Sequence, residues 1–202
     1  MILYYASPNK IINPTFGDDF NLLENLELAK EYSAANPNNT NAYVHTYKLD
    51  TTDLKILDFT EYSVLSWLAE LMKHRDADDS KRYKILSKEF INKYGIDTDE
   101  YDVVKSIKIN SYILKEFVRD NVDLDIMEEL LSLGDVDTQY CLKSQKAFNN
   151  LKEIKTDLLS IDFKEFNDKY NARDINTRRN MLELIDSNKN KIKNVFSRLL
   201  ER

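Results

Sequence analysis

Residues 2–7 read Ile-Leu-Tyr-Tyr-Ala-Ser, a short apolar run that ends in small residues. Apolar and aromatic residues in such a run favour a β-strand, and Pro8 and Pro14 indicate that a loop follows it. Because side chains alternate between the two faces of a strand, Tyr4 and Tyr5 are expected to face opposite ways. One tyrosine should therefore lie in the core and the other at a cleft or in solvent.

The rest of the chain mixes short strands and helices in irregular order, which is typical of an α+β domain. Apolar residues at helical spacing predict helices over residues 21–35, 63–75, 80–95, 111–120 and 123–134. Alternating, aromatic or β-branched residues predict strands over residues 42–50, 101–109 and 138–144. No sequence repeat with a fixed period is present.

The C-terminal part of the chain has a different pattern. Apolar residues recur at helical spacing from Ile175 to Leu200 without Gly or Pro, and residues 186–188 could separate two helices. The sequence therefore predicts a domain over residues 1–155 and a helical C-terminal extension over residues 156–202. The extension would pack on the domain or on a partner.

Composition and charge limit the classes of function. The chain has 202 residues and a net charge of −6, with 17 Lys/Arg and 26 Asp/Glu in residues 1–150 and 12 and 9 in residues 151–202. An acidic body argues against a nucleic-acid groove. The single cysteine, Cys141, excludes an internal disulfide and fits a reducing compartment. Without a membrane-spanning apolar run or a signal peptide, we expect a cytoplasmic protein that does not enter a membrane.

Six landmarks occur in an order that resembles an uncharacterised bacterial family assigned to the ADP-ribosyltransferase-like fold. In that family a Leu-Tyr-His-Gly-Ser strand is followed by an Asp-Phe-Gly-x-Gly-Phe-Tyr-x-Thr stretch, a Tyr-x-Leu strand, a Trp helix, a Tyr-Asp strand and a Leu-Gly-x-x-x-Gln element. The corresponding segments here are LYYAS, FGDDFNLLENLELA, YKLD, LSWLAELMKHR, YDVVKSIKINSY and LGDVDTQYCLKSQKAF. The resemblance covers residues 1–180 and implies a split β-sheet core surrounded by helices.

The resemblance fits the framework better than the chemistry. The family's histidine falls on Tyr5, and its Phe-Tyr pair becomes Phe20-Asn21, while its late glutamine remains as Gln139. In this fold, a His or Arg on the first strand holds a ribose of NAD, an aromatic ring stacks on nicotinamide, and a late Glu or Gln contacts the ribose and the nucleophile. Tyr5 can donate one hydrogen bond, but Asn21 cannot stack. A neutral Gln139 cannot act as a general base.

The resemblance thus implies an NAD cleft whose contacts would come from Tyr5, Ser7, Phe20, Asn21 and His45. His45 could partly replace the missing histidine if its strand neighbours the first strand. Tyr5 and Gln139 would be the catalytic residues if any transfer survived. Because the loss of one positioned group can cost orders of magnitude in rate, impaired catalysis is the leading hypothesis.

Plain structural interpretations compete with each of these assignments. Tyr5 can be an ordinary strand residue, Gln139 a polar edge residue, His45 a satisfied core histidine and Cys141 an inert buried thiol. Two histidines and one cysteine far apart do not have the spacing of a zinc site, and no other metal site is expected.

Three functions remain open at this point. The leading one is a catalytically impaired ADP-ribosyltransferase-like protein that binds a protein partner, with a toxin–antitoxin or phage–host conflict as a setting suggested by fold analogy. The second is an active NAD-dependent transferase with a substituted site. The third is an interaction protein that works through its C-terminal helices.

Overall fold

The computed structural model of the chain describes residues 1–11, 14, 20–39, 41–74, 81–107, 129, 137–160 and 162–200, with the side chains of residues 81–83, 86 and 189–200 left out. Apart from residue 129, the helices expected at residues 111–120 and 123–134 lie outside the described residues.

Seven strands form one hydrogen-bonded sheet in the order β4-β5-β6-β2-β1-β3-β7. Only β4 and β5 pair in parallel among these strands; the other neighbours are antiparallel. Their bounds are β1 Ile2–Ser7, β2 Asn21–Leu23, β3 Tyr43–Leu49, β4 Ile56–Asp58, β5 Val103–Ile107, β6 Thr138–Leu142 and β7 Leu151–Leu158. Together with the helices, this mixed sheet confirms the predicted α+β class.

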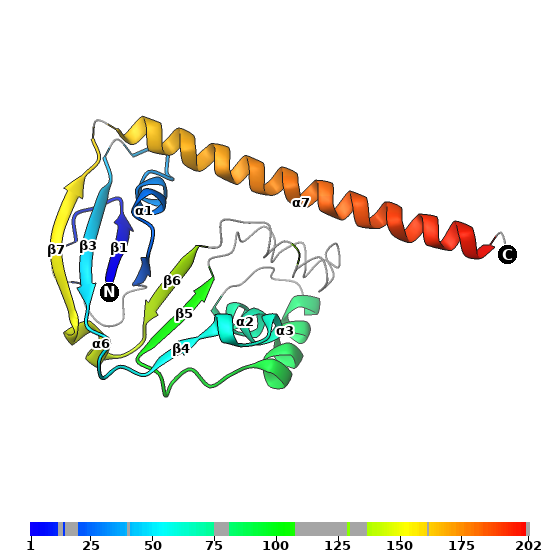
Figure 1. The fold of residues 1–202 in the computed structure, drawn as a ribbon, viewed down its shortest axis with the longest axis horizontal. Helices are drawn as coiled ribbons and strands as arrows, with labels where there is room; N and C mark the ends of the chain where they lie inside the picture. The colour runs from blue at the N-terminus through cyan, green and yellow to red at the C-terminus, as the bar shows by residue number, and fades with distance from the viewer. Residues whose placement is uncertain are drawn as a thin grey trace.

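Helices pack beside this sheet, and the last of them extends well past it (Figure 1). They are α1 Leu26–Ser33, the short 3-10 helix η1 Phe59–Glu61, α2 Val64–His74, α3 Lys81–Tyr94, α6 Gln145–Asn149 and α7 Phe163–Leu200. No helix of the described residues is both long and apolar enough to cross a membrane.

One side of the sheet, called here the helix face, is covered by α1, α2 and α7. Strand alternation and register give this face Tyr4, Leu23 and Val44, which belong to a cluster with Phe163 and Phe166 of α7. Further along the same face, Leu57 and Val104 pack with Trp67 of α2 and with Met181 and Ile185 of α7. Helix α7 therefore contributes buried side chains to two separate clusters. These side chains are Phe163, Phe166, Met181 and Ile185.

The opposite side, called here the aromatic face, is covered differently. It carries Leu3, Tyr5, Tyr47 and Tyr140, and these pack with Phe20 from the loop before β2 and with Ala147 and Phe148 of α6. Among the described residues, this face is therefore covered by one short helix and by the ring of Phe20.

Several boundaries differ from the sequence predictions. The helix expected over residues 21–35 is a strand at Asn21–Leu23 followed by α1, because Asn25 caps the helix by accepting hydrogen bonds from the N–H groups of Glu27 and Leu28. The extension expected to be helical from residue 156 begins with the last part of β7, and α7 starts at Phe163. Helix α7 is continuous through residues 186–188, so no break separates two helices there.

Candidate functional site

The register between β1 and β3 places Tyr5 directly opposite His45. Their ring centroids lie 6.4 Å apart, and His45 is completely buried. The sequence left open whether the strand of His45 neighbours the first strand, and in the structure it does. Both side chains point to the aromatic face.

Phe20 stacks on Tyr5, with a centroid distance of 4.2 Å and an interplanar angle of 14°. The same ring meets Tyr47 edge-on at 5.5 Å and Phe148 at 5.6 Å. Phe20 has 1% of its surface exposed, so its ring fills the space over β1 and β3. A planar ligand that stacks on Tyr5 from this side would have to take the place of Phe20.

Hydrogen bonds define which ring nitrogen of His45 carries the proton. The backbone N–H of Ile11 donates to His45 Nε2 at 3.2 Å, so Nε2 is the acceptor of a neutral imidazole. Nδ1–H then donates to Thr156 Oγ1 at 2.9 Å, with Glu153 Oε1 3.2 Å away. The imidazole therefore ties the segment after β1 to strand β7.

A β-bulge in β7 brings both β7 partners of His45 to the aromatic face. The register jumps between Thr46 and Tyr47, so that Glu153 pairs with Tyr47 and Thr156 pairs with His45, while Ile154 is the extra residue. Residues three apart in a regular strand would face opposite sides. The hydroxyl of Thr156 donates to Glu153 and lowers the pKa of its carboxyl group, and His45 lowers it further against the opposing effect of burial.

Tyr47 is the one residue of this group with an unsatisfied polar atom. Its side chain is 1% exposed, and its hydroxyl has no hydrogen-bond partner among the described residues. Burial raises the pKa of the Tyr47 phenol, with smaller contributions from Glu153 and Tyr5. The aromatic face thus keeps a buried donor that packing alone does not require.

The structure divides the residues expected from the sequence between the two faces. Ser7 follows Tyr5 on the aromatic face, where it is buried and its hydroxyl accepts a hydrogen bond from the N–H of Asn9 at 3.1 Å. Gln139 pairs with Leu23 and belongs to the helix face, where its Nε2 donates to Ser106 Oγ at 3.1 Å. Asn21 is exposed and lies on the same face as Gln139.

Tyr5, Ser7, Phe20 and His45 therefore come together, whereas Gln139 and Asn21 do not join them. Sequence reasoning named none of Tyr47, Glu153 and Thr156 as site residues. The alternation of Tyr43, His45 and Tyr47 in β3 was a usable signal for Tyr47. No local pattern signals Glu153 and Thr156, because the bulge sets their common face.

Chemically, the group on the aromatic face offers a neutral imidazole whose two nitrogens are both engaged, a carboxylate held by a threonine, and stacked rings. A general base needs a free acceptor directed at substrate, and neither nitrogen of His45 is free for that role. Among the described residues, no group of three or more His, Cys, Asp or Glu side chains is placed to hold a metal ion.

Comparison with known proteins identifies the family to which most of the chain belongs. Residues 1–153 match the family model described as protein of unknown function, DUF3990. Neither a curated protein nor a solved structure matches the chain. The matched range ends within β7, so Thr156 and the whole of α7 lie beyond it.

Proposed function

The chain belongs to the DUF3990 family, and from that premise we propose that it is a catalytically impaired ADP-ribosyltransferase-like protein that acts by binding a protein partner. The ADP-ribosyltransferase-like part of the proposal comes from the resemblance of residues 1–180. A nucleotide as a second ligand, and a toxin–antitoxin or phage–host conflict as the setting, belong to the same resemblance.

The observation that carries the proposal is the division of Tyr5 and Gln139 between opposite faces of one sheet. Tyr5 pairs with His45 on the aromatic face, and Gln139 pairs with Leu23 on the helix face. A transfer that used both residues would need them within reach of the same ribose. Tyr5 is also engaged in stacking on Phe20. Both features support impaired catalysis.

The test is NAD binding by calorimetry with the full chain, followed by mass detection of nicotinamide released from the same sample. We expect no release at millimolar NAD, because the positioned groups are altered or apart. Release above that of a heat-denatured sample would overturn the proposal. Binding of NAD without release would assign a nucleotide-holding role to the scaffold.

An active transferase with a substituted site is the second candidate, and the position of His45 directly opposite Tyr5 favours it. It requires that Tyr5→Phe and Gln139→Ala each abolish nicotinamide release. Unchanged release in both variants would exclude it.

A role for α7 in holding the partner is the third candidate, and it is favoured by the extension of this helix past the body (Figure 1). Deletion of residues 187–202 leaves Met181 and Ile185 in place on the body. Loss of partner capture in this truncated chain, with an unchanged unfolding midpoint, would support the role of α7. Retained capture would exclude it.

A further inference from the structure

Strand β7 is an edge of the sheet. It pairs with β3 through residues Leu151–Leu158, and no other described strand lies beside it. The backbone N–H and C=O groups on its outer side are thus available to an added strand. In Figure 1, β7 forms the outer margin of the molecule.

The bulge at Ile154 determines the face of the sheet on which each charged side chain of β7 lies. Lys152 pairs with Lys48 and Lys155 pairs with Thr46, which puts both β7 lysines on the helix face. Glu153 goes to the aromatic face, where Thr156 and His45 hold it. In a strand without a bulge, residues 152 and 155 would face opposite sides. Asp157 pairs with Val44 and joins the lysines on the helix face, so this face of the edge, together with Lys48, carries three lysines and one carboxylate.

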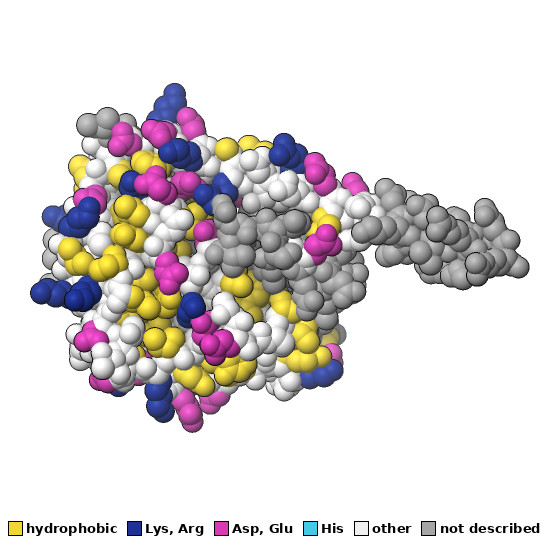
Figure 2. Space-filling model, in the orientation of Figure 1, with side chains coloured by type: hydrophobic (Ala, Val, Ile, Leu, Met, Phe, Trp, Pro, Cys, Tyr) yellow, Lys and Arg dark blue, Asp and Glu magenta, His cyan; other side chains and the backbone are white. Residues whose placement is uncertain are grey.

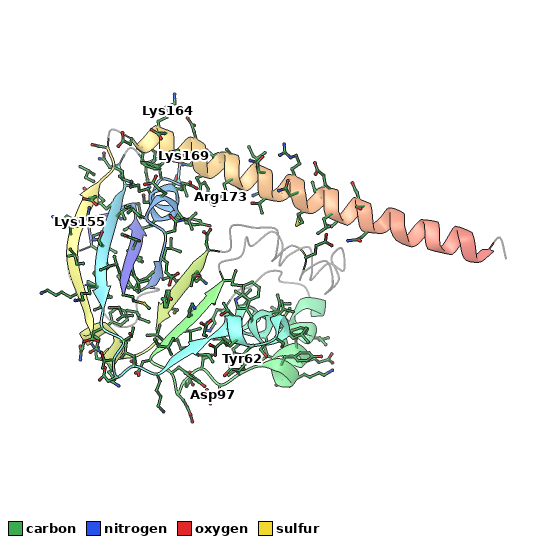
Figure 3. The ribbon with its side chains drawn as sticks, in the orientation of Figure 1. Tyr62, Asp97, Lys155, Lys164, Lys169 and Arg173 are labelled. Atoms are coloured by element: carbon green, nitrogen blue, oxygen red, sulfur yellow. The ribbon has the colours of Figure 1, made fainter. Side chains whose placement is uncertain are left out.

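Lys48, Lys152 and Lys155 form what we call the lysine patch. Lys48 and Lys152 lie directly opposite each other, an arrangement of like charges that costs stability. No carboxylate of the described residues lies within 4.0 Å of either of these two ammonium groups, and Lys155 pairs with Asp157 at 2.6 Å. All three lysines are exposed. In Figure 2, Lys and Arg side chains gather at the margin where Figure 1 places β7, and Figure 3 shows Lys155 on that strand.

Exposed apolar side chains beside the lysine patch fit a peptide ligand. Ile154 and Ile2 are 53% and 44% exposed and provide apolar contacts next to the lysines. Together these residues offer cations, apolar surface and a strand edge in one place.

We propose that the outer edge of β7 accepts an extended, acidic segment of a protein partner, which adds a strand to the sheet and pairs its carboxylates with the lysine patch. A second copy of this chain fits less well, because antiparallel edge-to-edge pairing of two β7 strands about a two-fold axis perpendicular to the sheet keeps equivalent faces together. That pairing would bring the lysine patches of both copies onto one face, where the lysines outnumber the two Asp157 carboxylates and repel one another.

The test uses the full chain and fluorescein-labelled peptides, with binding measured by fluorescence anisotropy. The probe alternates Glu and Val over eight residues; a first control replaces Glu by Gln, and a second keeps Glu but carries N-methyl groups on alternate amides. We expect the acidic probe to bind at least tenfold more tightly than either control. Weaker binding of the Gln peptide would measure the contribution of the carboxylates to affinity. Weaker binding of the N-methylated peptide would measure the contribution of backbone hydrogen bonds to the edge of β7.

Matched variants assign the site. Lys152→Gln with Lys155→Gln should weaken binding of the acidic probe at least tenfold, whereas Lys84→Gln with Lys88→Gln, which removes the same charge from exposed positions of α3, should change it less than twofold. Equal effects of the two pairs, or equal binding of the methylated peptide, would overturn the proposal. If a DNA duplex displaced the labelled probe at a lower concentration than the unlabelled probe does, the proposal would be overturned in favour of nucleic-acid binding at this edge.

This inference rests on the proposed function in one respect, since both assume that the chain holds a protein partner. The two can nevertheless fail separately. Nicotinamide release would overturn the proposed function whatever the peptides do, and the peptide series decides the role of β7 whatever NAD does.

Discussion

The two faces of the sheet are held by different means. The helix face is sealed by apolar side chains of α1, α2 and α7, and one ion pair, in which Arg173 Nε donates to Glu31 Oε2 at 2.8 Å, fixes α7 on α1 (Figure 3). The aromatic face is sealed by stacked rings and by hydrogen bonds that converge on a buried histidine. Apolar packing stabilises without direction, whereas a buried polar network specifies one arrangement. The second face is therefore the one whose geometry substitutions should alter most.

Loss of Phe20 is the severest test of this contrast. Phe20→Ala should lower the free energy of unfolding by about 3–5 kcal/mol, because it removes a fully buried ring that touches Tyr5, Tyr47 and Phe148. Urea unfolding followed by tyrosine fluorescence measures the change. Tyr62→Ala, at a ring that is 45% exposed, serves as the control and should cost about 0.5 kcal/mol. Equal costs would show that the aromatic cluster contributes no special packing.

The ion pair on the helix face supplies the next effect. Arg173→Leu should cost about 1.5–3 kcal/mol, since it leaves the carboxylate of Glu31, 8% exposed, without its cation. Arg179→Leu is the matched control on the same helix, because its partner Glu183 lies 3.9 Å away and both side chains are exposed. Thermal unfolding of the two variants should differ clearly. A shift as small for Arg173→Leu as for the control would mean that apolar contacts alone seat α7.

His45→Leu sharpens the comparison from the other face. It should cost about 1–3 kcal/mol, because the N–H of Ile11 loses its acceptor and Thr156 loses its donor. Hydrogen exchange at the Ile11 amide should become faster in this variant and stay unchanged in His74→Leu, whose imidazole is on α2. Unchanged exchange at Ile11 in both variants would contradict the proposed link between the loop and β3.

The smallest effect is a change in pH dependence. Thr156 and then His45 stabilise the charged form of Glu153, so its pKa is lower in the folded chain than the ordinary value of 4.5. This contribution is complete above pH 4.5 and is lost as the pH falls through the lowered folded pKa. When the pH is lowered from neutral to below 4.5, the free energy of unfolding should therefore fall less in the Glu153→Gln variant than in the unaltered chain. If the urea midpoints of the two proteins changed equally with pH, Glu153 would not be the source of this pH dependence.

Much of the architecture was predictable because local patterns and packing agree. The runs at residues 2–7, 42–50 and 101–109 have the apolar or alternating composition of strands, and the described residues of each contain one, at Ile2–Ser7, Tyr43–Leu49 and Val103–Ile107. Strand β7 was not predicted, since Lys-Glu-Ile-Lys lacks alternation and its outer edge has no neighbour to bury. Its bulge is set by pairing with β3, a contact more than one hundred residues away in the chain.

The candidate site was predictable only in part for the same reason. Tyr5 and His45 were named from the sequence, and the register placed them opposite each other. The face of Gln139 depends on the pairing of β6 with β2, and a shift of one residue reverses it. No single segment carries that information. Helical structure was expected from the periodicity of residues 175–200, whereas the continuity of α7 from Phe163 and its two contact points on the body were not predicted and follow from tertiary packing.

The two contacts of α7 also bear on the order in which the protein can fold during synthesis. Every residue of the cluster on the aromatic face lies before residue 152, so that cluster can close while the C-terminal part of the chain is still being made. The two clusters on the helix face are complete only after α7 has been synthesised. One needs Phe163 and Phe166, and the other needs Met181 and Ile185. A ribosome-bound chain that stops before α7 would thus present one finished face and one apolar face open to chaperones.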